Sequence, residues 1–156
     1  MSDTGCVIQT AWKSHFAVPA FNIPYLPMMR AVVDAVVAAD SFALIDVARL
    51  EWVKFEARGV RQIREEYLRC IEHGDGRAHT RLHLDHIPVI DEDNQRVDYL
   101  EIIDEALEVG FESVMLDGSR LPFEENVAAT KAVADRAHAA GVPVEAELGA
   151  VLGHEA

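Results

Sequence analysis

The sequence predicts an α/β protein of the (β/α)8 TIM-barrel type that is truncated after about five strands and four helices. Strand-like apolar runs alternate with helical patterns along the chain, which favours parallel strands joined by right-handed crossovers. Each of those runs ends in polar residues. No linker or shift in composition divides the 156 residues, so residues 1–156 are expected to form one incomplete barrel domain.

The first half of the chain holds two strand patterns and two helix patterns. Residues 16–23 are predicted to be a strand, followed by a proline-containing turn and a helix over residues 27–39 with apolar side chains at helical spacing. Residues 42–48 form an apolar run typical of a strand covered on both faces. Residues 60–73 have the pattern of a charged amphipathic helix, which Gly74 is expected to end.

The second half repeats the alternation. Residues 80–86 are predicted to be the third strand, and residues 99–109 a helix whose apolar positions recur every three or four residues. Residues 113–117 form the fourth strand. Residues 122–140 are expected to be a helix that opens with proline and acidic residues, which suit the positive end of the helix dipole, and residues 143–148 a fifth strand.

The polar residues at the strand ends decide between two arrangements of such a sheet. An open doubly wound sheet binds its ligand at a single switch point, whereas a barrel gathers residues from the C-terminal ends of many strands. Here every predicted strand contributes: Asn22, Asp46, His83 with Asp85 and His86, Asp117, and Glu145 with Glu147. We therefore favour the barrel. A complete barrel needs roughly 250 residues, so this one is expected to be incomplete.

Composition excludes several classes of partner. The chain has 14 Lys and Arg residues against 27 Asp and Glu residues, a net charge of −13, which repels nucleic acids and anionic membrane surfaces. Its apolar runs are shorter than the ~20 residues that span a bilayer. Cys6 and Cys70 form no disulfide framework, so reduced thiols and a cytoplasmic location are expected.

Alternation along the third strand gives its polar residues two different positions. His83 and Asp85 are predicted to face the barrel interior, with the intervening leucines toward the helices and His86 at the lip of the strand. A metal ligand at His86 beside a proton-shuttling Asp85 is the functional interpretation. A hydrogen-bonded histidine pair in a polar interior is the structural alternative.

The fifth strand carries two acids on one face. Glu145 and Glu147 are predicted to lie about 6.5 to 7 Å apart along the strand, both toward the interior. Without a cation, two inward carboxylates would be driven to share protons. Asp117 makes the same demand, although an Asp-Gly pair is also common in turns. A metal ion, a lysine or an arginine from elsewhere in the chain must therefore lie near these acids, and a divalent cation is the simplest partner for several acids beside histidines.

Four segments together resemble one known family. They are Ala20-Phe21-Asn22; His83-Leu84-Asp85-His86; residues 114–119 with residues 121–126; and residues 145–149 with Gly153-His154-Glu155. Over nearly its whole length the chain is similar to the class II, zinc-dependent fructose-bisphosphate and tagatose-bisphosphate aldolases.

The resemblance implies a reversible retro-aldol cleavage of a ketose bisphosphate to dihydroxyacetone phosphate and an aldehyde. In that family zinc polarises the ketone and stabilises the enediolate. Carried over to this sequence, Asp85 would be the proton donor, His86 a zinc ligand, and Asp117 and Glu147 ligands of a second metal position. Glu155 would lie on a mobile loop to which proton transfer is ascribed.

The sequence also departs from the family pattern. The histidine motif usually continues with glycine, whereas Ile87-Pro88 here opens a longer loop, and a serine common at the tip of the second strand is Ala48. Because an acidic site must still hold a phosphorylated sugar, Arg49 and Arg120 are predicted to bind its anionic groups. Together with Asn22 they are the expected substrate-binding residues.

The family's remaining zinc histidines and phosphate-binding loops come from its last three strands. The resemblance therefore implies that this chain alone is a weak aldolase or an inactive one, and that it works as a homo-oligomer or with a complementing C-terminal half. Two other functions stay open. One is a non-catalytic binding or assembly module that pairs through its exposed fifth strand, and the other is another metal-dependent lyase or hydrolase on the same scaffold.

Overall fold

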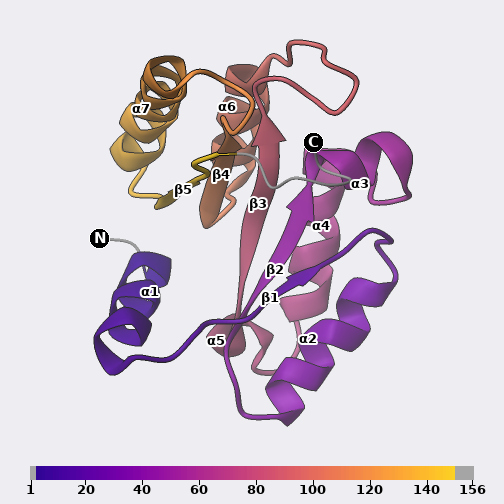
Figure 1. Ribbon diagram of the computed structural model, residues 1–156. Coiled ribbons are helices and arrows are strands. Elements are labelled where there is room, and N and C mark those ends of the chain that lie inside the picture. The colour runs from indigo at the N-terminus through magenta and orange to yellow at the C-terminus, as the bar shows by residue number, and fades with distance from the viewer. Residues whose placement is uncertain (1–2, 150–156) are drawn as a thin grey trace.

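The computed structural model describes residues 3–149, which form one parallel sheet with helices packed on it (Figure 1). The strands are β1 (Ala20–Asn22), β2 (Ala43–Ala48), β3 (Thr80–Pro88), β4 (Ser113–Asp117) and β5 (Val144–Ala146). Their order in the sheet is their order in the chain, and every neighbouring pair is parallel. An open doubly wound sheet reverses its strand order at the switch point, whereas a barrel does not. The predicted α/β fold, with five consecutive strands of the barrel type, is confirmed.

Four of the helices lie side by side along one face of the sheet. The helices are α1 (Asp3–Ser14), α2 (Met28–Ala38), α3 (Arg49–Lys54), α4 (Val60–Ile71), α5 (Gly76–His79), α6 (Tyr99–Val109) and α7 (Phe123–Ala139). The four predicted helices are α2, α4, α6 and α7, and each contacts the next in that order. Three further helices, α1, α3 and α5, lie outside the predicted strand-helix alternation. None of the helices within residues 3–149 is both long and apolar enough to cross a membrane.

The hydrophobic core lies between the sheet and these four helices. Alternation turns Ile45 and Val47 of β2 and Leu82 and Leu84 of β3 toward the helices, where all four side chains are fully buried. Burial of such a side chain contributes on the order of 2 kcal/mol to the free energy of unfolding. Because this apolar layer holds the sheet and helices together, the other face of the sheet is left for polar residues.

That other face, called the inner face here, carries the alternate side chains of the same strands. Asp46 of β2 lies in register with His83 of β3, and both are buried. Asp85 follows on the same face toward the end of β3, at a position in register with Ala48. The orientation predicted for His83 and Asp85 is therefore the one that the strand adopts.

Helix α1 lies against the N-terminal end of the inner face. Asp3 pairs with Arg81 at the start of β3, and Ala11 is buried. The Arg81 guanidinium also lies 5.5 Å from the centre of the Phe42 ring, within the range of a cation–π contact. This helix therefore covers the end of the sheet opposite the strand ends that carry the predicted site.

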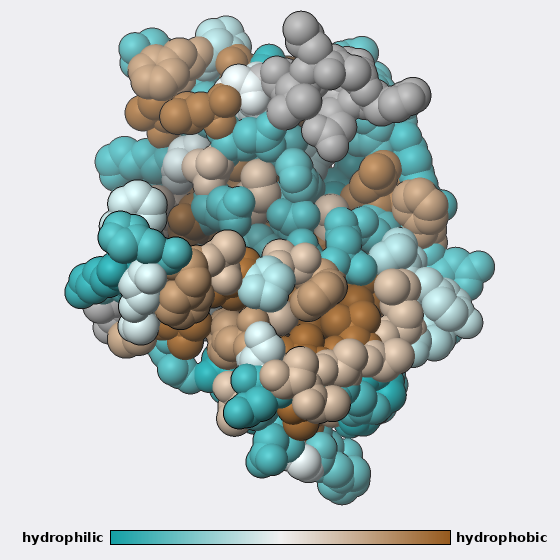
Figure 2. Space-filling model, turned by 60° about the horizontal axis from the view of Figure 1, so that its bottom comes forward, coloured by the Kyte–Doolittle hydropathy of each residue, from teal (hydrophilic) through white to brown (hydrophobic). Residues whose placement is uncertain are grey.

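The two outer strands are shorter than expected and have one neighbour each. A strand was predicted over residues 16–23 and another over residues 143–148, but β1 and β5 each span three residues. Within residues 3–149, β1 pairs with β2 alone and β5 with β4 alone. Large apolar side chains are exposed as well, including Trp12 and Phe21. Figure 2 shows hydrophobic residues gathered near the middle of one face of the molecule.

Asp46 is held on the inner face with little access to solvent. Its side chain is 7% exposed, and its Oδ1 atom has no hydrogen-bond partner within the described part of the chain. Burial, reinforced by the negative charge of Asp85 and opposed by His83, raises the pKa of Asp46 from 3.8 to about 6. The folded chain therefore holds a proton on this carboxyl more tightly than the unfolded chain does.

Replacing Asp46 by asparagine should remove a pH-dependent loss of stability. Because its pKa is raised in the folded chain, Asp46 lowers the free energy of unfolding progressively between about pH 4 and about pH 6, and by a constant amount at higher pH. The free energy of unfolding of D46N relative to the unaltered chain should rise by on the order of 2 kcal/mol between pH 4 and pH 7 in urea titrations. The exposed control D34N should show no such rise. If the difference in the free energy of unfolding between D46N and the unaltered chain did not change with pH, burial would not raise the pKa of this carboxyl.

Candidate metal centre and cleft

An irregularity near the end of β3 aims two consecutive side chains at the inner face. Between Leu84 and Ile87 the pairing with β4 advances three residues along β3 but only two along β4, so β3 contains a bulge. Leu84 and Ile87 are both fully buried, and Asp85 and His86 between them both line a cleft. His86 has a φ of 37°, in the left-handed region that residues other than glycine rarely adopt. Strict alternation would have turned Asp85 and His86 to opposite faces.

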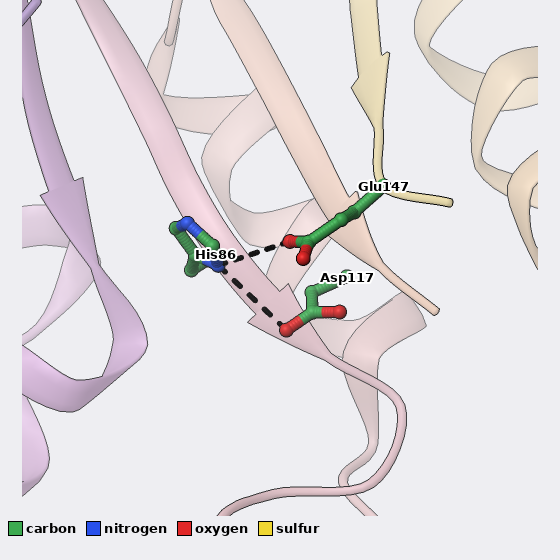
Figure 3. Close-up of side chains that lie close together, drawn as sticks. All are labelled: His86, Asp117 and Glu147. Carbon is green, nitrogen blue, oxygen red and sulfur yellow. Dashed lines mark ion pairs between the residues drawn. The ribbon is translucent and has the colours of Figure 1, made fainter. Parts of the chain in front are cut away.

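Three predicted site residues meet at the ends of neighbouring strands (Figure 3). The Nδ1 atom of His86 lies 3.6 Å from Asp117 Oδ2 and 3.6 Å from Glu147 Oε2. Asp117 is the last residue of β4, and Glu147 comes directly after β5. One donor atom from each of the three residues lies within 4.8 Å of the other two. One imidazole nitrogen and two carboxylate oxygens at this spacing can share a divalent cation.

The charges in this group depend on one another. The adjacent Asp117 carboxylate raises the pKa of His86 to about 9, against the effect of burial, and the nearby carboxylates of Asp85 and Glu147 add to the rise. Burial opposes the ionisation of Asp117, but the adjacent His86 ring and hydrogen bonding from Ser119 overcome that effect and lower its pKa to about 2. A protonated imidazole therefore supplies positive charge between the carboxylates. A metal cation would take over this role by displacing the proton.

Asn126 of α7 fixes the chain around two of these acids. Its Nδ2 atom donates a hydrogen bond to the Glu147 carbonyl (2.8 Å), and its Oδ1 accepts one from Thr130 (3.1 Å). A Cβ atom on Gly118 would lie 2.3 Å from Asn126 Oδ1, so any larger residue directly after Asp117 would displace the Asn126 amide. The Asp117-Gly118 pair thus allows close packing against α7, which the sequence interpretation as a turn did not include.

His83 lies deeper on the inner face, next to the predicted proton donor. Its Nδ1 atom is 2.8 Å from Ser113 Oγ, and its Nε2 atom is 3.7 Å from both Asp85 Oδ1 and Glu145 Oε2. The ring is only 3% exposed. His83 and His86 therefore do not form the hydrogen-bonded pair of the structural alternative, because each contacts a different set of acids.

A cleft of about 450 Å³ opens beside the three-residue cluster. Its lining includes Asp85 and all three predicted substrate-binding residues: Asn22 ends β1, Arg49 begins α3 directly after β2, and Arg120 lies between β4 and α7. These positions are all at the C-terminal ends of strands, where barrel enzymes carry their active sites. Glu155, the other predicted catalytic residue, lies outside the described residues.

Helix α3 adds two charged residues to the cleft that sequence reasoning missed. Glu51 is 8% exposed and accepts hydrogen bonds from the Ala48 backbone N–H and the Asn22 side chain. Burial raises the pKa of the Glu51 carboxyl. Lys54 lines the cleft and lies 3.0 Å from Glu92. A helix of six residues is too short to produce a periodic pattern, so no sequence signal marked these side chains.

Comparison with known proteins places the chain in one family. The family model described as "Fructose-bisphosphate aldolase class-II" matches residues 2–156. The chain is 35% identical over 145 residues to the fructose-bisphosphate aldolase of Giardia intestinalis and 34% identical over 154 residues to that of Treponema pallidum. Each alignment covers 93% of this chain but 41% of the relative. The chain therefore spans less than half the length of these relatives.

Solved structures agree with this assignment. The crystal structure of the YdjI aldolase from Escherichia coli K12 matches with a TM-score of 0.71 and 29% identity, over 90% of this chain and 49% of that one. A fructose-bisphosphate aldolase from Campylobacter jejuni has the same fold, with a TM-score of 0.70 at 24% identity. The sequence match along its whole length and the shared fold together establish that the chain belongs to the class II fructose-bisphosphate aldolase family.

Proposed function

We propose that the chain supplies the metal-binding part of an aldolase active site that cleaves a ketose phosphate to dihydroxyacetone phosphate and an aldehyde. The observation that carries the proposal is the convergence of His86, Asp117 and Glu147 beside a cleft. Relatives of this chain are named fructose-bisphosphate aldolases, and class II members of that family depend on a metal ion.

The donor set fits a divalent cation. Imidazole nitrogen and carboxylate oxygen are common zinc ligands, and two carboxylates beside one imidazole need positive charge between them. His86, Asp117 and Glu147 would hold the ion together. When bound, a zinc ion or a similar metal would act as a Lewis acid on the ketone oxygen of the substrate.

Asp85 is the proposed proton donor. It lines the cleft directly before His86 in the chain, and its side chain is 14% exposed, which leaves the carboxyl within reach of a substrate. Its Oδ1 atom lies 3.7 Å from His83 Nε2, so the buried imidazole limits the positions that the carboxyl can take. A general acid must keep such a fixed position relative to the atom that it protonates. Glu155 stays a proposal from the resemblance alone.

The phosphorylated sugar is proposed to lie along the cleft. Asn22, Arg49 and Arg120 line it from three different strand ends and would contact hydroxyl and anionic groups of the substrate. The open edges at β1 and β5 support a further proposal, that additional strands, from a second polypeptide or a second copy of the chain, complete the sheet. An assembly module without catalysis would use the same edges but would need no metal.

Removing any one of the three proposed ligands should weaken zinc binding. H86A, D117N and E147Q are each expected to lower the affinity at least tenfold, because a site with two remaining protein donors holds the ion poorly. Equilibrium dialysis with zinc quantification measures the affinity. E145Q is the matched control, since Glu145 lies on the same segment as Glu147 but contacts His83 instead. Equal zinc affinity in these four variants and in the unaltered chain would rule out this metal site.

Aldolase chemistry itself is tested by a coupled assay for dihydroxyacetone phosphate, with ketose phosphates as substrates and zinc supplied. We expect weak or no release from the chain alone, and zinc-dependent release from a version extended by the strands that complete a barrel. D85N in the extended version should reduce release by at least a hundredfold, in line with the usual contribution of a general acid. An extended version that binds zinc yet never releases triose phosphate from any ketose phosphate would refute the aldolase proposal and favour another metal-dependent lyase or a hydrolase.

A further inference from the structure

The segment between β3 and α6 folds into a hairpin over residues 89–97. Ile90 and Arg96 pair as an antiparallel bridge across it. Ile90 and Glu92 contribute to the lining of the cleft. The hairpin therefore forms part of one wall of the cleft, close to the end of the strand that carries His86.

Asp91 ties this hairpin together and contacts two arginines. Its Oδ1 atom accepts hydrogen bonds from the backbone N–H groups of Asp93 (3.1 Å) and Gln95 (2.8 Å). Its Oδ2 atom lies 3.4 Å from Arg49 Nη1, and its carbonyl oxygen accepts a hydrogen bond from Arg120 Nη1 (3.2 Å). One residue thus holds two guanidinium groups that come from different strand ends.

The pair of arginines is not an ordinary surface feature. The Arg49 and Asp91 side chains are 20% and 9% exposed, whereas ion pairs in contact with bulk water contribute little to stability or position. Within residues 3–149 the only side-chain partner of Arg49 is Asp91, through Nη1, so its other N–H donors are available to a ligand. Arg49 and Arg120 both line the cleft that contains the acidic cluster.

We propose that Asp91 is a positioning residue that holds Arg49 and Arg120 as a single binding site for the anionic end group of the substrate. This inference rests on the proposed function and narrows it to substrates that carry a phosphate or a carboxylate at the end that faces these two arginines. Paired guanidinium groups bind both anions through parallel N–H donors. Such a site is needed here, since the carboxylates of the metal cluster and a chain charge of −13 repel an anionic substrate.

Two variants of the hairpin, D91N and D93N, distinguish the effect of losing the contact with Arg49 from the effect of losing one negative charge. In D91N the amide oxygen can still accept the hydrogen bonds from Asp93 and Gln95, while the amide nitrogen cannot accept one from Arg49. D93N makes the same change of charge on the same hairpin, at a side chain that is 73% exposed and pairs with Lys54. R49A and R120A remove the proposed binding groups themselves and keep the test decisive if D91N does not fold.

Methyl phosphate and glycolate serve as probes of the two anion types. Each is titrated into the full chain, with and without zinc, and followed by the side-chain N–H signals of arginine in NMR spectra. We expect the Arg49 and Arg120 signals to shift, and R49A, R120A and D91N each to weaken binding of the preferred probe roughly tenfold, the usual effect of a lost charge-assisted hydrogen bond. D93N should bind as the unaltered chain does. The stronger probe identifies the end group of the substrate.

A double variant tests whether Asp91 acts through Arg49. If it does, D91N combined with R49A should bind no more weakly than R49A alone, because the group that Asp91 positions is already absent. Three results would each overturn the inference. The losses of affinity in D91N and R49A could add up in the double variant, or D91N and D93N could bind the probe equally well. Anion binding could also depend on zinc and be unchanged by R49A and R120A. Failure of the aldolase proposal has a different signature, since zinc binding and triose phosphate release are measured separately from these titrations.

Discussion

The carboxylates of Asp117 and Glu147 reach the same imidazole from adjacent strand ends, and this concentration of negative charge needs a cation. Parallel strands place their C-terminal residues at one edge of the sheet, so acids at the ends of β4 and β5 are brought together by the fold itself. His86 meets them only because the bulge in β3 turns it inward, in a left-handed backbone conformation that costs about 1 kcal/mol. Strain of this kind is typical of functional sites rather than of packing.

The rest of the fold supports the C-terminal edge of the sheet by placing apolar side chains on one face and polar side chains on the other. Leu82, Leu84 and their neighbours bury the outer face of the sheet against helices, which leaves the inner face to Asp46, His83 and Asp85. The inner face is therefore polar at some cost in stability, as the raised pKa of Asp46 indicates. Asn126 then joins α7 to the backbone at Glu147, so the helix layer also positions one proposed ligand.

Local patterns predicted the parts of the fold that depend on local sequence. Helix α6 and strand β4 begin and end where expected, because hydrophobic periodicity and a terminal glycine or aspartate mark them. The alternation of apolar and polar residues breaks at Asp85 and His86, where two polar residues precede Ile87. Only the pairing with β4 shows that this break is a bulge within the strand rather than its end. The contacts of Asp91 were missed for a similar reason: a polar loop has no periodicity, and its partners lie 29 and 42 residues away.

Diffraction from crystals of the zinc-loaded chain at the zinc absorption edge tests the central claim most directly, because anomalous scattering locates the metal without assuming its ligands. The account predicts one strong peak between His86, Asp117 and Glu147, with imidazole nitrogen and carboxylate oxygens at about 2.0–2.2 Å. A fully loaded crystal whose zinc lies elsewhere, for example at the exposed His73, with these three residues in contact only with one another, would contradict it.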